Sequence, residues 1–443
     1  MLFEAKLLNF MKPRKIIYLE KILRFMAEAI LKRHRPKIVG ITGSVGKSSA
    51  KEAIFLVLKN NFKVRKNEEN YNNEIGIPLT IIGAKTGGRN PFKWMLVFLK
   101  WIFWLISPWG YPKILILEMA IDRAGDMKYF MSFIPLEVGI LTNISSSHLE
   151  FFKNIKAIAK EKSILVKAVP ANGVAILNTD NPFIREEMAG IKAKIVSYGF
   201  NENAEIKVTD VRFNYDENGN SKGLSFKLNY DKKIIPLRLP HIIAKHQLYA
   251  ALVAVGVGEY FKVNMIEALA DLEDFQSPLG RMNLIFGINE SLIIDDTYNA
   301  SPASTLAAID TMDQINAKRK ILILGDMFEL GEDSESGHME VVKSVLEGKF
   351  DKLILVGSRM KKAAQNLLGS NSHIKSVLFF DNPNQAGKII KSIIKEGDLI
   401  LVKGSQGMRM EKVIEKIIPE TENASKVLCR QSKVWKKKEF VEN

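Results

Sequence analysis

The chain of 443 residues is 47% hydrophobic and 26% charged, which excludes an intrinsically disordered protein and predicts about two or three globular domains. Its formal net charge of +15 suits an anionic substrate, a nucleic acid or an anionic membrane surface, and charge alone does not choose among them. The single cysteine excludes a disulfide framework and a Cys-based zinc site within one chain. No uninterrupted apolar core precedes a small-residue cleavage site, so we expect a cytoplasmic protein.

Two segments near the N-terminus suit contact with either the protein body or a membrane. Residues 14–35 carry apolar side chains at helical spacing and basic side chains elsewhere, which predicts an amphipathic basic helix within the N-terminal region 1–36. Residues 94–106 read WMLVFLKWIFWLI, shorter than the about 20 apolar residues that span a bilayer. We favour packing against the next domain for both; the alternative is peripheral contact with the inner face of a membrane.

A nucleotide-binding α/β domain is predicted over residues 37–280. The β-rich run KIVGIT at 37–42 is followed by a glycine-containing loop and a helix over 48–58, which is the usual opening of such a domain. Helical sequence separates further strand candidates, so the sheet is expected to be mostly parallel. These candidates are residues 114–118, 138–142, 173–178 and 195–198.

The remaining chain divides into three parts. Residues 204–239 read as short alternating strands and predict a small antiparallel appendix, which a helix over 246–261 follows. Residues 281–420 predict a Rossmann-like C-terminal α/β domain, and residues 421–443 predict a loosely ordered basic tail. The strand candidates of the C-terminal domain are residues 292–295, 320–324, 352–356, 376–379 and 399–402.

The sequence TGSVGKSS follows the first strand and predicts a phosphate-binding loop. Backbone N–H groups of a glycine-rich turn close around phosphates, a lysine neutralises their charge, and a serine coordinates Mg²⁺. The helix that follows adds the positive end of its dipole. The loop is a variant, because Ile41 stands where the usual pattern has its first glycine. Its residues are Thr42, Gly43, Ser44, Val45, Gly46, Lys47, Ser48 and Ser49.

Polar residues that follow the next strands are candidates for the same site. Glu118 ends the strand ILILE and Asn143 follows VGILT, at the edge where ligands of parallel sheets collect. His148 lies a few residues further on, and its functional and structural interpretations are about equally favoured. Lys162, within AKEKSIL, is by itself best explained as a surface lysine.

Seven blocks in the same order resemble the Mur ligase family. They are TGSVGKSS, LEMAIDRAGDM, TNISSSHLEFF, AKEKSIL, GRMN with DDTYNASPAS, LILGDMFELGEDSESGH, and LVKGSQGMRMEKV. The resemblance extends from about residue 37 to residue 418. Within the family, DDTYNASP and GDMFELG resemble the branch that adds D-alanyl-D-alanine to a UDP-linked muramoyl tripeptide, a precursor of the cell wall.

The resemblance implies an ATP-dependent ligase that joins a carboxylate to an amine. ATP phosphorylates the carboxylate, the amine attacks the acyl phosphate, and the product is an amide with ADP and phosphate. The reason for the first step is chemical: a carboxylate is a poor electrophile until one oxygen becomes a good leaving group. The site must then shield the acyl phosphate from water.

The resemblance also implies roles for individual residues. Ser48 and Glu118 would hold one Mg²⁺, while His148 and Lys162, the latter as a carbamate, would hold a second; a carbamate turns this lysine from a surface cation into a metal ligand. Arg281 would approach the phosphates when the C-terminal domain closes. The other implied nucleotide contacts are His246, Asp296 and Asn299, and the implied substrate contacts are Asp326, Glu329, Lys403 and Ser405.

The chain departs from the family pattern in three places. Ala250 stands where the second asparagine of an adenine-contacting block is expected, and Ser301 stands where the family's YNANP has its second asparagine. Only about 36 residues precede the first strand, so the family's UDP-binding N-terminal domain is expected to be absent. We expect the basic helix and residues 94–106 to hold the anionic or lipid-like end of the substrate instead.

Three alternatives stay open from the sequence. A ligase of the same chemistry with another acceptor, such as a pseudomurein-type precursor or a polyglutamate chain, fits the same motifs. A nucleotide-binding membrane scaffold fits the basic helix but does not need the full set of catalytic residues. Nucleic-acid binding rests on net charge alone and is not expected, and we expect a monomer.

Overall fold

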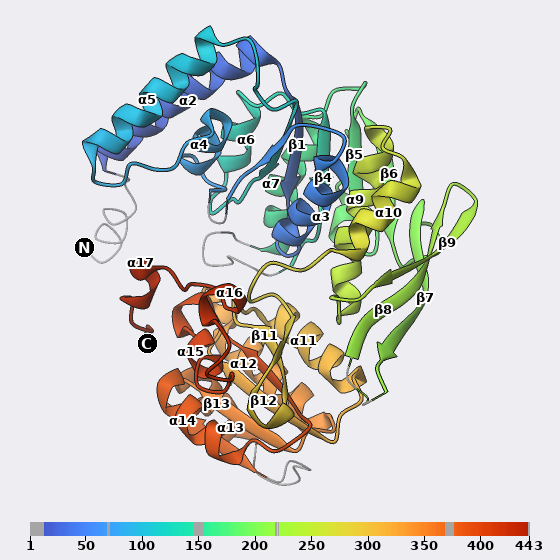
Figure 1. Ribbon diagram of the computed structural model, residues 1–443, viewed down its shortest axis with the longest axis vertical. Coiled ribbons are helices and arrows are strands. Elements are labelled where there is room, and N and C mark those ends of the chain that lie inside the picture. Colours follow the sequence, from blue (N-terminus) through green and yellow to red (C-terminus); the bar gives the residue numbers. More distant parts are fainter. Residues whose placement is uncertain are drawn as a thin grey trace.

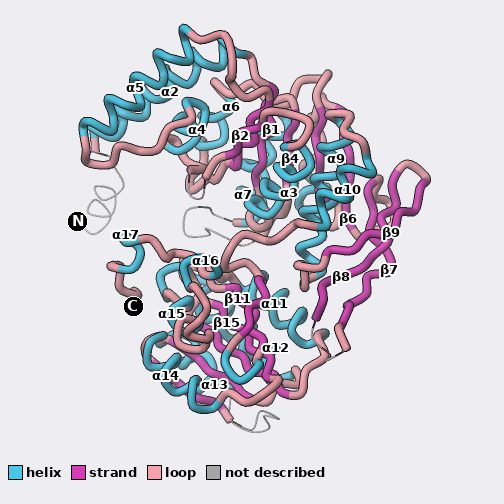
Figure 2. Tube along the Cα trace, viewed as in Figure 1, coloured by secondary structure: helices cyan, strands magenta, loops and turns pink. Residues whose placement is uncertain are grey.

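The computed structural model describes residues 13–68, 71–145, 152, 154–217, 219, 221–367 and 376–441. These residues form a larger N-terminal half and a smaller C-terminal half, each built on its own sheet with helices on both faces (Figures 1 and 2). The predicted α/β class is confirmed, and the cleft between the halves is the place where residues from both sheets meet.

The first sheet has nine strands in the order β2-β3-β1-β4-β5-β6-β7-β8-β9. All pairs from β2 to β7 are parallel, and the last two pairs are antiparallel. The strand bounds are β1 Lys37–Thr42, β2 Val64–Lys66, β3 Ile114–Glu118, β4 Val138–Leu141, β5 Val174–Asn178, β6 Lys194–Gly199, β7 Ile206–Tyr215, β8 Ser221–Tyr230 and β9 Lys233–Leu239.

Two groups of helices cover this sheet because its central strands are apolar on both faces. Val39 and Ile41 of β1 face α3, α9 and α10, whereas Ile38 faces the opposite layer that includes α2, α4 and α7. The bounds are α2 Arg14–His34, α3 Lys47–Lys59, α4 Gly76–Ile82, α5 Pro91–Ile106, α6 Asp126–Met131, α7 Ile155–Lys167, α8 Pro182–Glu186, α9 Leu248–Tyr260 and α10 Met265–Glu273.

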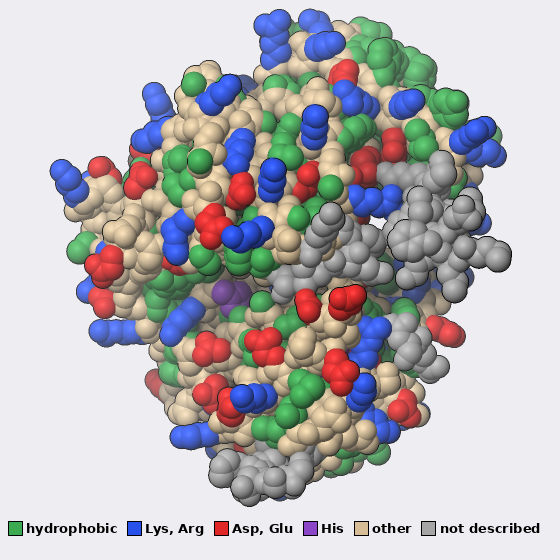
Figure 3. Space-filling view, turned by 180° about the vertical axis from the view of Figure 1, so that it is seen from behind, with side chains coloured by type: hydrophobic (Ala, Val, Ile, Leu, Met, Phe, Trp, Pro, Cys, Tyr) green, Lys and Arg blue, Asp and Glu red, His purple; other side chains and the backbone are tan. Residues whose placement is uncertain are grey.

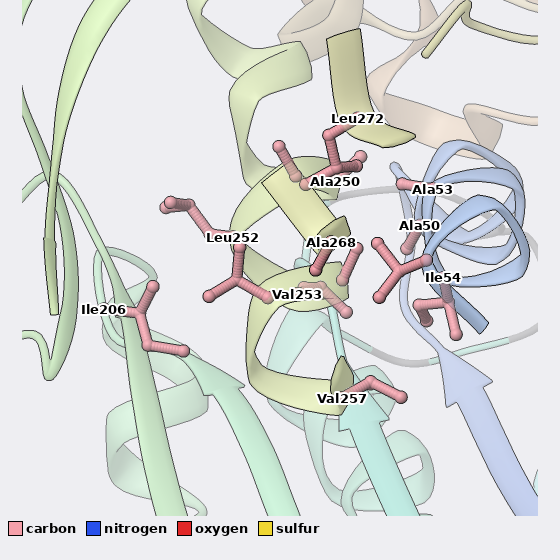
Figure 4. Close-up of a cluster of buried hydrophobic side chains, with 14 of the residues drawn as sticks. Ala50, Ala53, Ile54, Ile206, Ala250, Leu252, Val253, Val257, Ala268 and Leu272 are labelled. Atoms are coloured by element: carbon pink, nitrogen blue, oxygen red, sulfur yellow. The ribbon is translucent and has the colours of Figure 1, made fainter. Parts of the chain in front are cut away.

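Helices α3 and α9 pack closely through small and branched side chains. Ala50 and Ala53 of α3 point toward Ala250 and Val253 of α9 in Figure 4. The alanines let the two helix backbones approach, so the start of α3, which carries the phosphate-loop residues, is held firmly against the sheet.

The antiparallel strands predicted over residues 204–239 are present, and they continue the central sheet. Strand β7 pairs in parallel with β6 through Tyr198 and Gly199, so the antiparallel strands β7, β8 and β9 extend the central sheet. The sequence pattern identified these strands correctly, but it does not encode which strand lies next to β6.

The second sheet has the order β10-β11-β15-β12-β13-β14, and only the pair β10–β11 is antiparallel. Strand β10, Asn283–Phe286, was missed in the sequence. The other strands are β11 Leu292–Asp296, β12 Arg319–Gly325, β13 Lys352–Val356, β14 Val377–Phe380 and β15 Asp398–Lys403. The helices are α11 Pro302–Gln314, α12 Ser334–Glu347, α13 Ser358–Leu367, α14 Pro383–Ile393, α15 Glu411–Ile414, α16 Ala424–Val427 and α17 Lys433–Lys436.

The tail is not loosely ordered where the structure describes it, and this expectation was wrong. Arg430 is buried and pairs with Glu411 of α15 at 2.8 Å, and its guanidinium also donates to the Thr297 carbonyl. Arg409 donates to the carbonyl oxygens of Trp435 and Lys438. Residues 424–438 therefore belong to the C-terminal half.

Helix α2 packs into the core of the N-terminal half through one face, which buries Leu23, Met26, Ala27, Ile30 and Leu31. Helix α5 lies beside it (Figure 1) and buries only Val97 and Trp104 completely. Among the described residues, no helix is long and apolar enough to cross a membrane.

Candidate active site

The phosphate loop connects β1 to the N-terminus of α3. Gly43 and Gly46 have positive φ angles of 152° and 87°, and a side chain at Gly43 would collide with the Thr142 hydroxyl. The Lys47 ammonium group turns back and donates to the Gly43 carbonyl at 2.7 Å. The loop therefore encloses a small cationic space at the positive end of a helix, which suits phosphate groups.

The end of β4 holds this loop in place from behind. The Thr142 hydroxyl donates to the Val45 carbonyl at 2.6 Å, and the Ser44 amide donates to the Asn143 carbonyl at 2.7 Å. Asn143, predicted as a nucleotide contact, thus borders the cavity and also shapes the loop through its backbone.

Glu118 at the end of β3 is surrounded by donors. Its carboxylate accepts from Ser48 at 3.1 Å and Asn72 at 3.4 Å, and it pairs with Lys51 at 3.2 Å. Burial opposes ionisation, but the charges of Lys51, Lys47 and Arg281 outweigh this effect and hold the pKa of Glu118 below its ordinary value. Glu118 is therefore an ionised carboxylate beside a serine hydroxyl.

The pair Ser48 and Glu118 fits one Mg²⁺ ion. Magnesium is usually held by one or two carboxylates or hydroxyls together with substrate phosphates, and it keeps several waters. Among the described residues no group of three or more His, Cys, Asp or Glu side chains gathers as a metal cluster, so a protein-only cage is not formed there. The donor set suits an ion that arrives with a nucleotide.

Lys162 of α7 is buried in the interior. Burial, followed by the charge of Lys47, holds the pKa of the Lys162 amine well below its ordinary value. The neighbouring Glu161 carboxylate accepts from the backbone N–H groups of Gly125 and Met127, at 2.9 Å each. Burial therefore favours the neutral amine of Lys162, and the interpretation as a surface lysine was wrong.

The C-terminal half supplies the other wall. Arg281 lies with its guanidinium carbon 4.1 Å from the centre of the Tyr298 ring and reaches Ser48 at 3.4 Å. Asp296 forms a buried ion pair with Lys403 at 2.6 Å, and Lys403 also donates to the Asn299 carbonyl at 2.9 Å. Arg281 thus links the second half of the molecule to the phosphate loop.

A cavity of about 350 Å³ lies between these walls, and Figure 3 shows the hollow between the two halves with a histidine in it. Its polar lining includes Lys47, Ser48, Glu118 and Arg281. The lining also includes His246 and aromatic and apolar side chains, among them Tyr198, Tyr249, Ala250, Val253, Ala303 and Ala307.

His246 also lines the cavity and is half-buried, and desolvation lowers the pKa of its imidazole, although the charge of Asp296 opposes the shift. The ring is therefore neutral at pH 7 and able to donate and accept a hydrogen bond. Asn299 lies in the same wall, and its side-chain oxygen accepts from the Gln406 amide at 3.2 Å.

Of the four predicted substrate contacts only Lys403 lines the cavity, although Asp326 and Ser405 are neighbours, since the Asp326 carbonyl accepts from the Ser405 amide at 3.1 Å. The Ser405 hydroxyl donates to the Ala300 carbonyl and accepts from the Phe328 amide. Asp326 accepts from the amides of Arg359 and Met360 at the start of α13, and Glu329 is exposed in the loop after β12. His148 lies outside the described residues.

Several residues of the site were missed in the sequence. Lys51 lies one helical turn after Lys47 and pairs with Glu118, a spacing that could have revealed it. Asn72 and Asp122 also border the cavity, and Asp122 raises the pKa of Lys162 against the effect of burial. Tyr298 follows Asp296 closely, but only the fold shows that its ring supports Arg281.

The fold and the cavity together define a nucleotide-binding enzyme in which a P-loop domain and a second α/β domain enclose one site. The chain belongs to the Mur ligase family: residues 109–258 match the Mur ligase middle domain, and residues 280–406 match the Mur ligase, glutamate ligase domain. The resemblance read from the sequence motifs is thereby confirmed.

Individual relatives and structures agree with this membership. The chain is 27% identical over 399 residues to the UDP-N-acetylmuramoyl-tripeptide–D-alanyl-D-alanine ligase of Bacillus subtilis, covering 89% of this chain and 79% of that protein. The Rickettsia prowazekii enzyme of the same name is 28% identical, with 87% and 80% covered. The MurF ligase of Thermotoga maritima in complex with ADP is 26% identical, with a TM-score of 0.73 over 90% of this chain and 83% of that one.

Proposed function

We propose that this protein is an ADP-forming ligase that joins D-alanyl-D-alanine to a UDP-N-acetylmuramoyl-tripeptide. The observation that carries the proposal is the cavity to which both halves contribute, with Arg281 reaching across to Ser48 at 3.4 Å beside an ionised Glu118. This arrangement suits transfer of a phosphoryl group from ATP to a carboxylate. The named relatives support the choice of the two substrates.

ATP would lie along the cavity with its phosphates at the phosphate loop. Backbone N–H groups of the phosphate loop, apart from that of Ser44, which donates to the Asn143 carbonyl, would bind the phosphates together with the Lys47 ammonium group. A Mg²⁺ held by Ser48 and Glu118 would neutralise their charge. Asp296 and Asn299, which line the cavity, would contact the ribose. His246 and the aromatic and apolar part of the lining would receive the base, where Ala250 offers no polar contact.

The chemistry needs charge stabilisation more than a nucleophilic side chain. As the carboxylate oxygen of the tripeptide attacks the γ-phosphorus, negative charge grows on the phosphoryl oxygens, and Lys47 and Arg281 would stabilise that charge, one from each half of the molecule. The stacked Tyr298 ring fixes the direction of Arg281. Attack by the dipeptide amine then expels phosphate, and closure of the two halves would exclude the water that competes with this amine.

Lys162 is proposed to act as a carbamate. The neutral form of a lysine amine attacks CO₂, and the carbamate that forms would be an anion close to Lys47. The charge of Lys47 is one cause of the lowered pKa of Lys162. With His148 it would hold a second Mg²⁺, whose chemistry is to orient and activate the attacking carboxylate. Lys403, Ser405, Asp326 and Glu329 stay proposed contacts of the dipeptide side.

The enzyme is proposed to act as a monomer in the cytoplasm, where ATP and nucleotide-linked precursors are found. The test is phosphate release from ATP and Mg²⁺ by the purified chain, with UDP-N-acetylmuramoyl-tripeptide and D-alanyl-D-alanine supplied separately and together. We expect release only with both substrates, accompanied by an amide product in the mass spectrum. ATP binding without turnover on this pair would contradict the proposed substrates and direct the search to other acceptors.

A further inference from the structure

Helices α2 and α5 present a continuous apolar surface to solvent. On α5, Phe92, Leu96, Leu99, Phe103 and Ile106 recur at intervals of four and three residues, which places them on one side of the helix. All of them are exposed, and Phe92 and Ile106 have 73% and 74% of their surface open. Val97 and Trp104 lie on the opposite side and are buried. Helix α5 is therefore apolar on both its buried and its open face.

The open face of α2 repeats this arrangement. Tyr18, Ile22 and Phe25 are exposed at the same spacing of four and three residues. Phe25 and Phe98 both contact the Trp101 ring, with ring centres 6.2 Å and 5.3 Å from it. Trp101 lies on the side of α5 away from the row of Phe92 to Ile106, and the exposed Phe98 and Met95 cover the helix surface between Trp101 and that row. The exposed apolar side chains of the two helices thus form one surface, which we call the α2–α5 face.

Basic residues border the α2–α5 face. At about 100° of rotation per residue, Lys21 and Lys32 lie on one edge of the α2 row, and Lys15 and Arg33 lie on the other, all of them exposed. No Asp or Glu occurs from residue 75 to residue 117. Figure 3 shows hydrophobic and basic side chains together at the upper end of the molecule, where these helices lie.

The dimensions agree with a position parallel to a bilayer surface. The 16 residues of α5 extend over about 24 Å, less than the roughly 30 Å of a hydrocarbon core. An apolar face with a basic border suits the boundary between acyl chains and anionic headgroups. Trp109, 81% exposed in the loop after α5, adds an aromatic ring of the kind found at that depth.

We propose that the α2–α5 face binds the surface of an anionic lipid bilayer. Large exposed apolar surfaces with a polar border mark interaction sites, and here the border is basic without an acidic counterpart on α5. A protein partner would need an apolar groove of the same length with acidic edges. An anionic membrane offers an apolar interior beneath negatively charged headgroups over its whole surface. Binding would hold the enzyme at the membrane without any segment crossing it.

The test is flotation of the purified full chain with vesicles, without nucleotide or substrate. One set contains phosphatidylcholine alone, and the other contains equal parts of phosphatidylcholine and phosphatidylglycerol. We expect binding to the second set, decreasing as salt is raised. Leu96→Gln with Leu99→Gln should weaken the partition coefficient by about 100-fold, since each removes a side chain that enters the membrane. Lys15→Gln with Lys21→Gln should weaken it by about 30-fold.

Matched controls change the same residue types elsewhere. Ile266 and Phe286 are exposed on α10 and β10, and Lys388 and Lys391 are exposed on α14; changing either pair to Gln should leave flotation unaltered. Wild-type protein that stays unbound with anionic vesicles, or variants that bind as well as the wild type, would overturn the proposal. A dimer in light scattering that the Leu96 and Leu99 changes abolish, without vesicle binding, would instead make the face an interface between copies. Phosphate release by the wild-type chain is measured in solution without vesicles, so the proposed function and the proposed membrane binding fail separately.

Discussion

The ion pair between Lys51 and Glu118 is predicted to stabilise the N-terminal half strongly, and Lys51→Met tests this. Both side chains are almost completely buried and their charged atoms are 3.2 Å apart. At an effective dielectric constant of about 20, that separation corresponds to roughly 5 kcal/mol of attraction before desolvation. Removal of one partner from a buried pair typically costs about 3 to 5 kcal/mol.

Lys51→Met is expected to lower the free energy of unfolding by about 3 kcal/mol, the lower end of that range, because Glu118 keeps other partners. Ser48 and Asn72 still donate to it, and Lys47 remains close. The measurement is urea unfolding of the purified protein at pH 7. Lys59→Met at the exposed end of the same helix is the control and should change the free energy of unfolding by less than about 0.5 kcal/mol.

The direction of the pKa shift of Glu118 predicts how the free energy of unfolding depends on pH. The folded protein holds the pKa of Glu118 below its ordinary value, so the carboxylate contributes stability that is full above that ordinary value and is lost as the pH falls through the folded pKa. Without Lys51 this contribution shrinks. The difference in the free energy of unfolding between wild type and Lys51→Met should therefore be largest near pH 7 and decrease below about pH 4.

A double-mutant cycle with Glu118→Gln isolates the pair. Each single change leaves one buried group without its partner, whereas the double change removes both charges. The decrease in the free energy of unfolding of the double variant should therefore be about 2 kcal/mol smaller than the sum of the decreases of the two single variants. Additive losses, or a Lys51→Met variant as stable as the control, would refute the reasoning and mean that Glu118 is stabilised by its hydrogen bonds alone.

Further predictions concern four other buried or bridging groups. Arg281→Met should lower kcat by about 100-fold or more in the phosphate-release assay and leave the melting temperature unchanged. Arg430→Met should lower the free energy of unfolding of the C-terminal half by about 3 kcal/mol, because it leaves part of the Glu411 carboxylate unpaired in the interior; an unchanged urea midpoint would contradict the packing of the tail. Gln247→Leu should cost about 2 kcal/mol, since the backbone N–H groups that it now binds would stay buried without an acceptor. Protein equilibrated with carbon-13-labelled bicarbonate should show a carbamate signal that Lys162→Arg abolishes; a wild-type spectrum without it would exclude the modification under those conditions.

The strands of the central sheets could be predicted because they are buried on both faces and so read as continuous apolar runs. Residues 114–118 and 352–356 were predicted with the bounds that β3 and β13 have. Strands β2 and β10 were missed, since β2 is a three-residue edge strand with two basic side chains and β10 is a short edge strand with exposed Phe286. At an edge, burial leaves only a weak pattern in the sequence.

The candidate site was predictable to the extent that local motifs carry it. The phosphate loop and Glu118 follow from residues next to strand ends, and the structure brings Ser48 and Glu118 to within 3.1 Å. Lys162 is different, because nothing in its local sequence shows that it is buried; the family resemblance was needed to identify it. Tyr298 and Lys51 were missed because each acts through a neighbour that is distant in the chain.

Asp326 shows why a polar residue at the end of a parallel strand is an ambiguous signal. It follows β12 at the edge where ligands collect, as Glu118 follows β3, and this position supports the substrate contact that the family resemblance implies. In the structure its carboxylate accepts from the amides of Met360 at 2.8 Å and Arg359 at 3.2 Å, the groups that an α13 N-terminus leaves unpaired. Each carboxylate oxygen accepts one of these bonds and keeps a second acceptor site, so the cap of α13 and the proposed substrate contact are compatible. The backbone carbonyl of Asp326 also accepts from the amide of Ser405 at 3.1 Å. A polar residue at a strand end can thus cap the next helix, bind a ligand or do both, and the sequence alone does not distinguish these roles.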